Sequence, residues 1–219
     1  MAEDPRERGP KGPQPSQQQD PPGIEAEMDP KPDYGEKTYK GSGKLTGKAA
    51  IITGGDSGIG RAVALAFARE GADVLISYLN EETDAKETAR VVSATGRKCV
   101  PVPGDITDEK HCQSIIQTAV KEFGRLDILV NNAAYQMSRD SIEEIPTDEF
   151  DRIMKTNLYA MFWLCKYAVP HLKPGASIIN TASIQADNPS PNLLPYAATK
   201  AAIQNFTGGL GQMLGKKGI

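Results

Sequence analysis

The sequence predicts an α/β fold in which a single domain holds a parallel sheet with helices packed on both faces. Short, near-continuous apolar segments alternate along the chain with longer segments whose apolar residues recur at helical spacing. Strands that are apolar along their whole length are typical of parallel sheets, because crossover helices bury both faces of such a sheet. The 219 residues carry a formal net charge of -3, which suits one domain with a sizeable core.

Each expected strand is a short apolar run, and the expected helices carry apolar stripes. The first helix has such a stripe, and the third opens with Asp108 and Glu109, where the helix dipole favours acids. The strands are expected at 49–53, 74–78, 99–102, 126–130 and 176–181. The helices are expected at 61–70, 81–94, 108–123, 147–172 and 193–216. Ligands of such sheets lie beyond the carboxyl ends of the strands, so residues at those ends are the site candidates.

Residues 1–44 differ in composition from residues 45–219 and are expected to form a separate arm. This segment is rich in proline and glutamine and nearly lacks large apolar residues, so it buries too little surface to offset its ordering entropy. The first interpretation is a flexible arm. The alternative is an arm that packs on a neighbouring subunit through a few larger side chains, Ile24, Met28, Tyr34 and Tyr39.

The composition excludes several classes of protein. There is no basic excess that would favour nucleic acid, and no apolar run reaches the roughly 18 residues of a membrane span. Cys99, Cys112 and Cys165 are scattered without Cys-x-x-Cys spacing, which indicates reduced thiols and a cytoplasmic location rather than disulfides or zinc. With only His111 and His171 available, we expect no metal site.

A glycine-rich turn follows the first strand and predicts a nucleotide site. Gly54, Gly58 and Gly60 let the backbone turn tightly and approach a pyrophosphate at a helix N-terminus. Their spacing is Gly-x-x-x-Gly-x-Gly rather than Gly-x-Gly-x-x-Gly, and no Lys-Ser/Thr pair follows, which argues against a nucleoside triphosphatase. The other turn residues expected to contact the cofactor are Asp56, Ser57 and Ile59.

The end of the second strand bears on the choice between NAD and NADP. An acid about 20 residues beyond the glycines usually holds the ribose of NAD, but this position falls on Tyr78, Leu79 and Asn80. The absence of an acid there favours NADP weakly. No arginine stands there to hold a 2′-phosphate, so both cofactors remain open.

Tyr196 and Lys200 stand four residues apart at the start of the last expected helix. That spacing puts both side chains on one helix face, and an ammonium beside a phenol stabilises the phenolate. A phenol made acidic in this way can exchange a proton with a carbonyl or alcohol oxygen. Ser183, at the end of the last strand, is placed to share that oxygen.

These motifs together resemble those of the short-chain dehydrogenase/reductases. The resemblance runs from Lys44 to the end of the chain and rests on the glycine turn after Thr53, Asp105, Asn131-Asn132-Ala133, Asn157, Ser183 and Tyr196-x-x-x-Lys200. Within the family, the arm segment at 22–28 and Thr-Gly-Gly-Asp-Ser-Gly-Ile-Gly look like the glucose- and ribitol-dehydrogenase-like and aldehyde-reductase branch. The resemblance implies a Rossmann-like fold and hydride transfer between NAD(P)(H) and an alcohol, aldehyde, ketone or sugar.

The resemblance also implies roles for individual residues. Tyr196 would be the general acid/base, Lys200 would hold the nicotinamide ribose, and Ser183 would orient the substrate oxygen. Asn157 would position a water that relays protons to Lys200; its alternative is a helix-kink residue. The remaining expected cofactor contacts are Asp105 at the adenine (alternatively a helix N-cap), Ile106 beside it, Asn131 under the adenosine ribose, and Ala133.

Two departures from the family pattern affect these expectations. Ala134 stands where the family usually has glycine, which narrows the cofactor cleft. The sequence ends at Ile219, where the family continues into further strands and a substrate loop, so we expect a truncated fold whose last strands are missing and whose turnover is impaired. A non-catalytic nucleotide-binding or oligomer-forming protein is therefore the alternative function; an epimerase or dehydratase fits the glycine spacing less well.

The helices at 147–172 and 193–216 carry apolar residues on more than one face. One face is expected to meet the sheet, and the other to meet a second copy in a homodimer or homotetramer, as in the family's helical dimer contact. The alternative is that both faces are covered within one chain. The expected ligand is a small carbonyl or alcohol compound.

Overall fold

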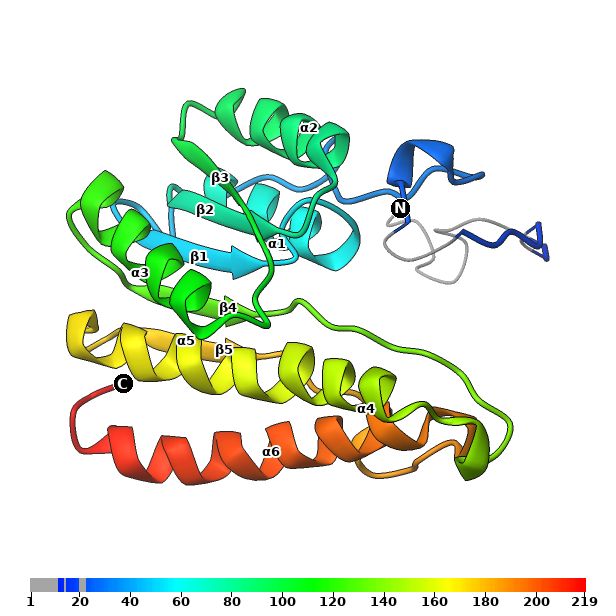
Figure 1. The fold of residues 1–219 in the computed structure, drawn as a ribbon. Helices are drawn as coiled ribbons and strands as arrows, with labels where there is room; N and C mark the ends of the chain where they lie inside the picture. The colour runs from blue at the N-terminus through cyan, green and yellow to red at the C-terminus, as the bar shows by residue number, and fades with distance from the viewer. Residues whose placement is uncertain (1–11, 14, 20–22) are drawn as a thin grey trace, which may run out of the picture.

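The computed structural model describes residues 12–13, 15–19 and 23–219. Within them, five parallel strands form one sheet in the order β3-β2-β1-β4-β5, as Figure 1 shows. The strands are β1 (Ala49–Thr53), β2 (Asp73–Tyr78), β3 (Cys99–Pro103), β4 (Ile128–Asn131) and β5 (Ser177–Asn180). The main helices are α1 (Gly58–Arg69), α2 (Glu82–Ser93), α3 (Glu109–Phe123), α4 (Thr147–Met154), α5 (Ala160–Ala168) and α6 (Leu194–Gly215). This arrangement confirms the predicted α/β fold.

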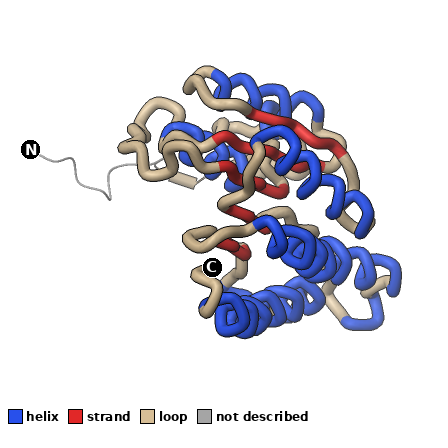
Figure 2. Tube along the Cα trace, turned by 90° about the vertical axis from the view of Figure 1, so that its left-hand side faces the viewer, coloured by secondary structure: helices blue, strands red, loops and turns tan. Residues whose placement is uncertain are grey.

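The two faces of the sheet are buried under different helices, and the strands lie between the helix layers in Figure 2. Successive side chains of a strand point to opposite faces, so Ile51 and Ile52 of β1 enter different cores. Ile52 packs with residues of α1 and α2, whereas Ile51 packs with residues of α3, α5 and α6. Burying an isoleucine side chain stabilises a fold by roughly 1.5–3 kcal/mol, which explains why these short apolar runs become the central strands.

The strand order places the switch in winding direction between β1 and β4. From β1 the chain moves through β2 to β3 and then returns to the other side of β1 for β4 and β5. Crossovers that leave in opposite directions open a crevice at the carboxyl ends of the two strands. The glycine-rich turn at 54–60 and the segment 131–134 follow these two strands directly.

The helix expected at 147–172 is helical throughout but not uniform. A π-helical turn at Lys155–Tyr159 separates α4 from α5, and a 3-10 turn at Val169–His171 ends the segment. Single π turns often occur at functional sites, and here the turn contains Asn157. A π turn adds a single residue to one turn of the helix, which hardly changes the spacing of apolar residues along the segment. The sequence pattern therefore did not indicate this interruption.

The arm runs along α1 of its own chain (Figure 1). The Arg69 guanidinium donates hydrogen bonds to the backbone carbonyls of Gly35, Glu36 and Tyr39. Residues 1–11, 14 and 20–22 of the predicted arm lie outside the described residues. The boundary between an arm at 1–44 and a domain at 45–219 stays a prediction.

Strand β5 pairs with β4 on one side, and no strand within residues 23–219 pairs with its other side. Ile179 of β5 is 45% exposed, whereas Ile51 and Ile52 of β1 are fully buried. Among the described residues, no helix is long and apolar enough to cross a membrane. The three cysteines are free, and Cys112 and Cys165 are buried.

Candidate functional site

A cavity of about 420 Å³ lies at the carboxyl edge of the sheet. Its wall combines the glycine turn after β1 with the segments that follow β2, β3 and β4, and it extends to α4 and the π turn. The structure therefore brings together residues from four separate strand ends. The predicted cofactor residues on this wall are Gly54, Asp56, Ser57, Gly58, Ile59, Tyr78, Asp105, Ile106 and Ala133.

The glycine turn has a geometry that side chains would prevent. Gly54 and Gly58 have φ angles of +59° and +50°, in the left-handed region that favours glycine. At Gly60 a Cβ atom would lie 1.8 Å from the carbonyl oxygen of Gly54, a distance that no side chain tolerates. The turn therefore closes tightly on the first turn of α1 and leaves its backbone exposed toward the cavity.

The ends of β1 and β4 are fastened to each other beneath the cavity. The Thr53 hydroxyl accepts hydrogen bonds from the backbone N–H groups of Asn132 and Ala133, both at 3.0 Å. The Asn132 side-chain amide donates to the carbonyl oxygens of Thr53 and Gly54 at 3.2 and 3.3 Å. These bonds fix the position of the glycine turn relative to the segment after β4.

The structure separates the roles of the two neighbouring asparagines. Asn131 is 8% exposed, and its side-chain amide donates to Oδ1 of Asn180 on β5 at 2.8 Å. Its neighbour Asn132 lies on the wall of the main cavity, whereas Asn131 lines a small internal cavity behind it. The predicted contact of Asn131 with the adenosine ribose stays a prediction.

Asp105 follows β3 and lies on the cavity wall. Its carboxylate accepts a hydrogen bond from the backbone N–H of Thr107 at 2.8 Å. The alternative in which Asp105 caps a helix is wrong, because Asp108 is the N-cap of α3 and accepts from the Lys110 N–H at 2.9 Å. The Asp105 side chain is exposed and available to a ligand.

Tyr196 and Lys200 lie on the same face of α6, as the sequence spacing predicted. The Lys200 Nζ atom is 5.4 Å from the centroid of the Tyr196 ring and 2.6 Å from the carbonyl oxygen of Thr181, which it donates to. Lys200 is 2% exposed, and this burial lowers the pKa of its ammonium group. Tyr196 is half-buried in the first turn of the helix.

Ser183 comes three residues after β5 and caps the short 3-10 helix η6 (Ile184–Ala186). Its hydroxyl oxygen accepts a hydrogen bond from the backbone N–H of Gln185 at 3.2 Å, and η6 packs against α6. The hydroxyl proton is therefore free of this bond and can be donated elsewhere. Ser183 and Tyr196 do not line the 420 Å³ cavity.

Asn157 links three parts of the site from within the π turn. It is 3% exposed; its Oδ1 accepts from the Tyr135 N–H at 2.7 Å, and its amide donates to the Tyr135 carbonyl at 3.0 Å and to Thr199 Oγ1 at 3.1 Å. Thr199 stands between Tyr196 and Lys200 in sequence and donates to the Tyr196 carbonyl. The π turn agrees with the alternative in which Asn157 marks a helix irregularity, whereas the expected positioning of a water stays a prediction. The Asn157 side chain ties α6 to the segment after β4.

Sequence reasoning missed part of the cavity wall. Arg152 and Thr156 stand four residues apart on one helix face, and the Arg152 guanidinium lies 4.7 Å from the Tyr135 ring centroid. Their four-residue spacing in the helix expected at 147–172, with Thr156 directly before Asn157, could have indicated that both face the site. The expectation that Ala134 borders the cofactor cleft agrees with its position on the wall, where Leu79 and Asn132 also lie; the other wall residues that were not singled out adjoin predicted ones: Ser77, Glu81, Gly104 and Tyr135.

Asp56, Tyr78 and Glu81 line the end of the cavity near β2. Burial raises the pKa of the Asp56 carboxyl above its usual range. The Tyr78 hydroxyl donates to Oε1 of Glu82 at 2.7 Å, and burial together with this bond raises the pKa of Tyr78 to about 12. Tyr78 is therefore a neutral hydrogen-bonding group at neutral pH.

A parallel sheet wound in both directions from its first strand, with a glycine turn after that strand, defines a Rossmann-like α/β protein. The model of the short chain dehydrogenase family matches residues 48–219. The chain belongs to this family, which confirms the resemblance drawn from its motifs.

Three curated relatives cover most of this chain. The uncharacterized oxidoreductase YhxD of Bacillus subtilis is 52% identical over 206 residues, which are 94% of this chain and 69% of that protein. NADPH-dependent aldehyde reductase 1, chloroplastic, of Arabidopsis thaliana is 43% identical over 204 residues, which are 90% of this chain and 71% of that protein. Glucose and ribitol dehydrogenase homolog 2 of Arabidopsis thaliana is 43% identical over 211 residues, which are 94% of this chain and 73% of that protein.

A solved structure has the same fold. A short chain dehydrogenase from Burkholderia cenocepacia J2315, in complex with NADP, superposes with a TM-score of 0.78 at 35% identity. The match covers 80% of this chain and 72% of that protein.

Proposed function

We propose that the chain is an NAD(P)(H)-dependent oxidoreductase that interconverts an alcohol with an aldehyde, a ketone or a sugar carbonyl. The observation that carries this proposal is the position of the Lys200 ammonium, 5.4 Å from the Tyr196 ring centroid on the helix that follows β5. A buried cation beside a phenol supports proton exchange with a substrate oxygen. Membership in the short chain dehydrogenase family supports the same chemistry.

The cavity residues fit a nicotinamide dinucleotide. The Gly54–Gly60 turn lies at the N-terminus of α1, where free backbone N–H groups and the helix dipole favour phosphate. Asp105 and Ile106 would contact the adenine, and Tyr78 the adenosine ribose. NADP is the preferred form in this proposal, because one relative is named for NADPH and the superposed structure contains NADP.

In the reduction direction, Tyr196 gives its hydroxyl proton to the carbonyl oxygen of the substrate. A reduced nicotinamide held in the cavity would supply the hydride to the carbonyl carbon, which gives the alcohol together with the proton from Tyr196. Lys200 stabilises the phenolate left on Tyr196, and Ser183 donates a second hydrogen bond to the substrate oxygen. In the oxidation direction the phenolate takes the proton back from the alcohol.

A proton path to Lys200 is supported by the small internal cavity beside it. This cavity has a volume of about 10 Å³, close to the space of one water, and both Asn157 and Lys200 line it. A water there could accept a proton from Lys200 and pass it on. Hydrogen bonds with the Tyr135 N–H and the Thr199 hydroxyl fix the position of the Asn157 side chain in the wall of this cavity.

The test of this function is NADPH oxidation with a panel of simple aldehydes, compared between the wild-type chain and Tyr196→Phe. We expect kcat to fall at least about 100-fold in the variant, because the acid/base step is lost, while NADPH binding stays within about twofold. Equal rates in the two proteins would sink the proposal. Parallel titrations with NADP and NAD measure the cofactor preference.

A second candidate is a nucleotide-binding protein with little turnover. The observation that favours it is that Ser183 and Tyr196 lie outside the wall of the main cavity, while the glycine turn and Asp105 lie on it. Tight NADPH binding without measurable oxidation by any aldehyde would support this function over the first. We also infer a homo-oligomer, because large apolar side chains remain exposed on α4, α5 and α6.

A further inference from the structure

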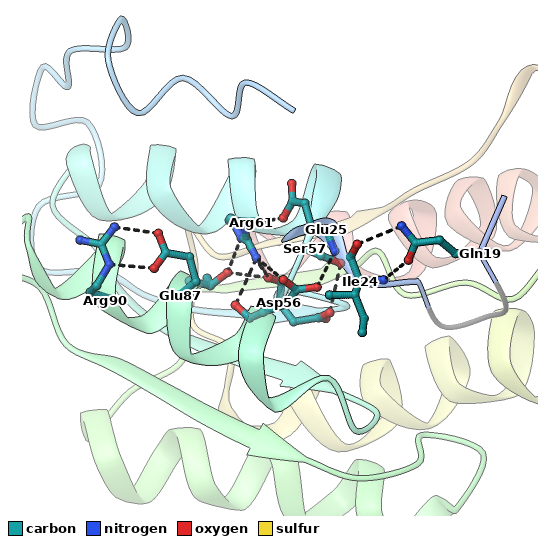
Figure 3. Close-up of polar contacts among 10 residues, drawn as sticks. Gln19, Ile24, Glu25, Asp56, Ser57, Arg61, Glu87 and Arg90 are labelled. Carbon is teal, nitrogen blue, oxygen red and sulfur yellow. Dashed lines mark hydrogen bonds and ion pairs between the residues drawn. The ribbon is translucent and has the colours of Figure 1, made fainter. Parts of the chain in front are cut away.

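A buried group of charges connects the N-terminal arm to the glycine turn (Figure 3). Arg61, in the first turn of α1, is 3% exposed, and its Nη1 atom lies 2.5 Å from Oε2 of Glu25 in the arm. Its Nη2 atom lies 3.2 Å from Oδ1 of Asp84 on α2. The Glu25 N–H donates to Oδ2 of the same aspartate at 2.9 Å, so arm, α1 and α2 meet at one point.

The same guanidinium also holds the turn itself. Arg61 donates from Nε and Nη2 to the carbonyl oxygen of Asp56 at 3.0 and 2.8 Å. Thr88 on α2 donates to this oxygen at 2.6 Å. Asp56 lies in the middle of the glycine turn and on the cavity wall, so the orientation of Arg61 determines how firmly this part of the turn is held.

The arm lines a hollow beside the glycine turn that is separate from the main cavity. Ser57 and Gly58 line both the main cavity and this hollow, whose other wall includes Ile24, Glu25 and Met28 of the arm. Glu25 is not among the residues that line the main cavity. The carboxylate therefore contacts Arg61 without standing on the wall of the main cavity.

Glu25 restrains Arg61 in a way that the remaining partners do not replace. The ring of Tyr34 in the arm lies 5.0 Å from the Arg61 Cζ atom and covers the guanidinium, so two arm residues, Glu25 and Tyr34, contact this one side chain. A buried guanidinium needs carboxylate partners to offset its desolvation. Without Glu25, Asp84 is the one remaining ion-pair partner of Arg61 among the described residues, and the guanidinium gains freedom to leave the Asp56 carbonyl.

We infer that Glu25 is a positioning residue for cofactor binding, which acts through Arg61 to hold Asp56, Ser57 and Gly58 in the conformation that receives the dinucleotide phosphates. This inference rests on the proposed dinucleotide-binding function. It gives the arm a part in the site although none of the arm residues that the structure describes lies on the cavity wall.

The test uses the full chain with Glu25→Ala, Glu25→Gln and the control Tyr39→Phe. Tyr39 anchors the arm to Glu70 after α1, far from the turn, so its variant loosens the arm without touching Arg61. We expect Glu25→Ala to raise the Kd and KM for NADPH about tenfold, because loss of the buried ion pair with Arg61 loosens the turn, with kcat within about twofold. Glu25→Gln, which keeps the shape and one acceptor, should lie between wild type and alanine.

Amide hydrogen exchange at residues 54–60 provides a readout that does not depend on activity. We expect faster exchange in Glu25→Ala than in wild type, with no change in Tyr39→Phe. An NADPH Kd in Glu25→Ala within twofold of wild type overturns the inference, as does an equal increase in Tyr39→Phe. A wild-type chain that binds neither NADPH nor NADH overturns the proposed function instead; exchange then decides alone, with unchanged rates overturning the contact between Glu25 and the turn and faster rates supporting it.

Discussion

At the scale of single residues, Gly60 has the least freedom to change. Its position in the first turn of α1 brings its Cα so close to Gly54 that a Cβ would lie 1.8 Å from the Gly54 carbonyl oxygen and 2.9 Å from the Gly55 Cα. The obstacle is backbone, which cannot rotate away as a side chain can. The glycine is therefore required by the closed shape of the turn.

Gly60→Ala should abolish detectable NADPH binding and lower the melting temperature, because the turn must open to admit the methyl group. The control is Gly209→Ala on α6, where nothing lies within 4 Å of the added Cβ and alanine favours a helix by up to about 1 kcal/mol. That variant should melt at a slightly higher temperature than wild type and bind NADPH normally. NADPH titration and thermal unfolding of the three proteins check both outcomes; normal binding by Gly60→Ala contradicts the closed turn.

Single residues also mark the limit of sequence reasoning at this site. The pairing of Tyr196 with Lys200 was predictable, because helical spacing alone puts side chains four apart on one face. The sequence did not predict that Asn131 and Asn132 line different cavities, because it does not show to which side each of two adjacent side chains at a strand end points. The bond from Asn157 to Tyr135 joins residues 22 apart and leaves no periodic signal.

At the scale of elements, the arm and α1 are joined at both ends of the helix. Near the helix N-terminus Glu25 pairs with Arg61, and beyond its C-terminus the Glu70 carboxylate accepts hydrogen bonds from the Tyr39 hydroxyl and from the N–H groups of Ser42 and Lys44. The Tyr39 bond, followed by the two backbone bonds, lowers the pKa of Glu70 to about 2 from the usual 4.5. The ionised carboxylate is thus the form that the folded chain prefers.

This preference predicts how the arm contact depends on pH. Because the folded pKa of Glu70 lies below the unfolded value, its contribution to stability is complete above about pH 4.5 and disappears as the pH falls towards 2. The melting temperature of Glu70→Gln should lie several degrees below that of wild type at pH 7, and the gap should close between pH 4.5 and 2. Thermal unfolding across this range measures the gap, with Glu27→Gln on the exposed arm surface as the control. A gap that stays constant with pH would contradict the role of the charged carboxylate.

The elements themselves were largely predictable, and the arm was not. Buried strands such as β1 and β2 are unbroken apolar runs, and their bounds agree with the sequence within a residue. The arm lacks such a pattern, since its contacts with α1 are made by Glu25, Arg69 and Glu70, whose charges look like a solvated surface in sequence. Long-range pairing of charges carries no period, so the path of residues 24–44 along α1 needed the structure.

At the scale of the whole molecule, one helical side of the chain remains apolar. Figure 1 shows α4, α5 and α6 together on the side of the sheet away from α2. Phe162 of α5 is 46% exposed and meets Phe206 of α6 edge to face at 6.5 Å between ring centroids. The other large exposed apolar side chains on these helices are Phe150, Leu194 and Met213, and Tyr159 is exposed on the π turn between α4 and α5. Large apolar side chains exposed together on neighbouring helices are typical of protein interfaces.

We expect this helical surface to join two copies of the chain, with Phe162 near the centre of the contact. A two-fold contact uses the same patch on both partners, so one substitution acts twice. Phe162→Glu should weaken dimerisation by about 2 kcal/mol or more, roughly 30-fold in Kd, because it buries a charge and removes an aromatic anchor. Light scattering over a concentration series measures the Kd, with Ile142→Glu as the control, since Ile142 is 67% exposed on the short helix Ile142–Glu144 outside this surface. A wild-type chain that stays monomeric at every concentration would contradict the predicted dimer. An equal loss in both variants would place the contact elsewhere.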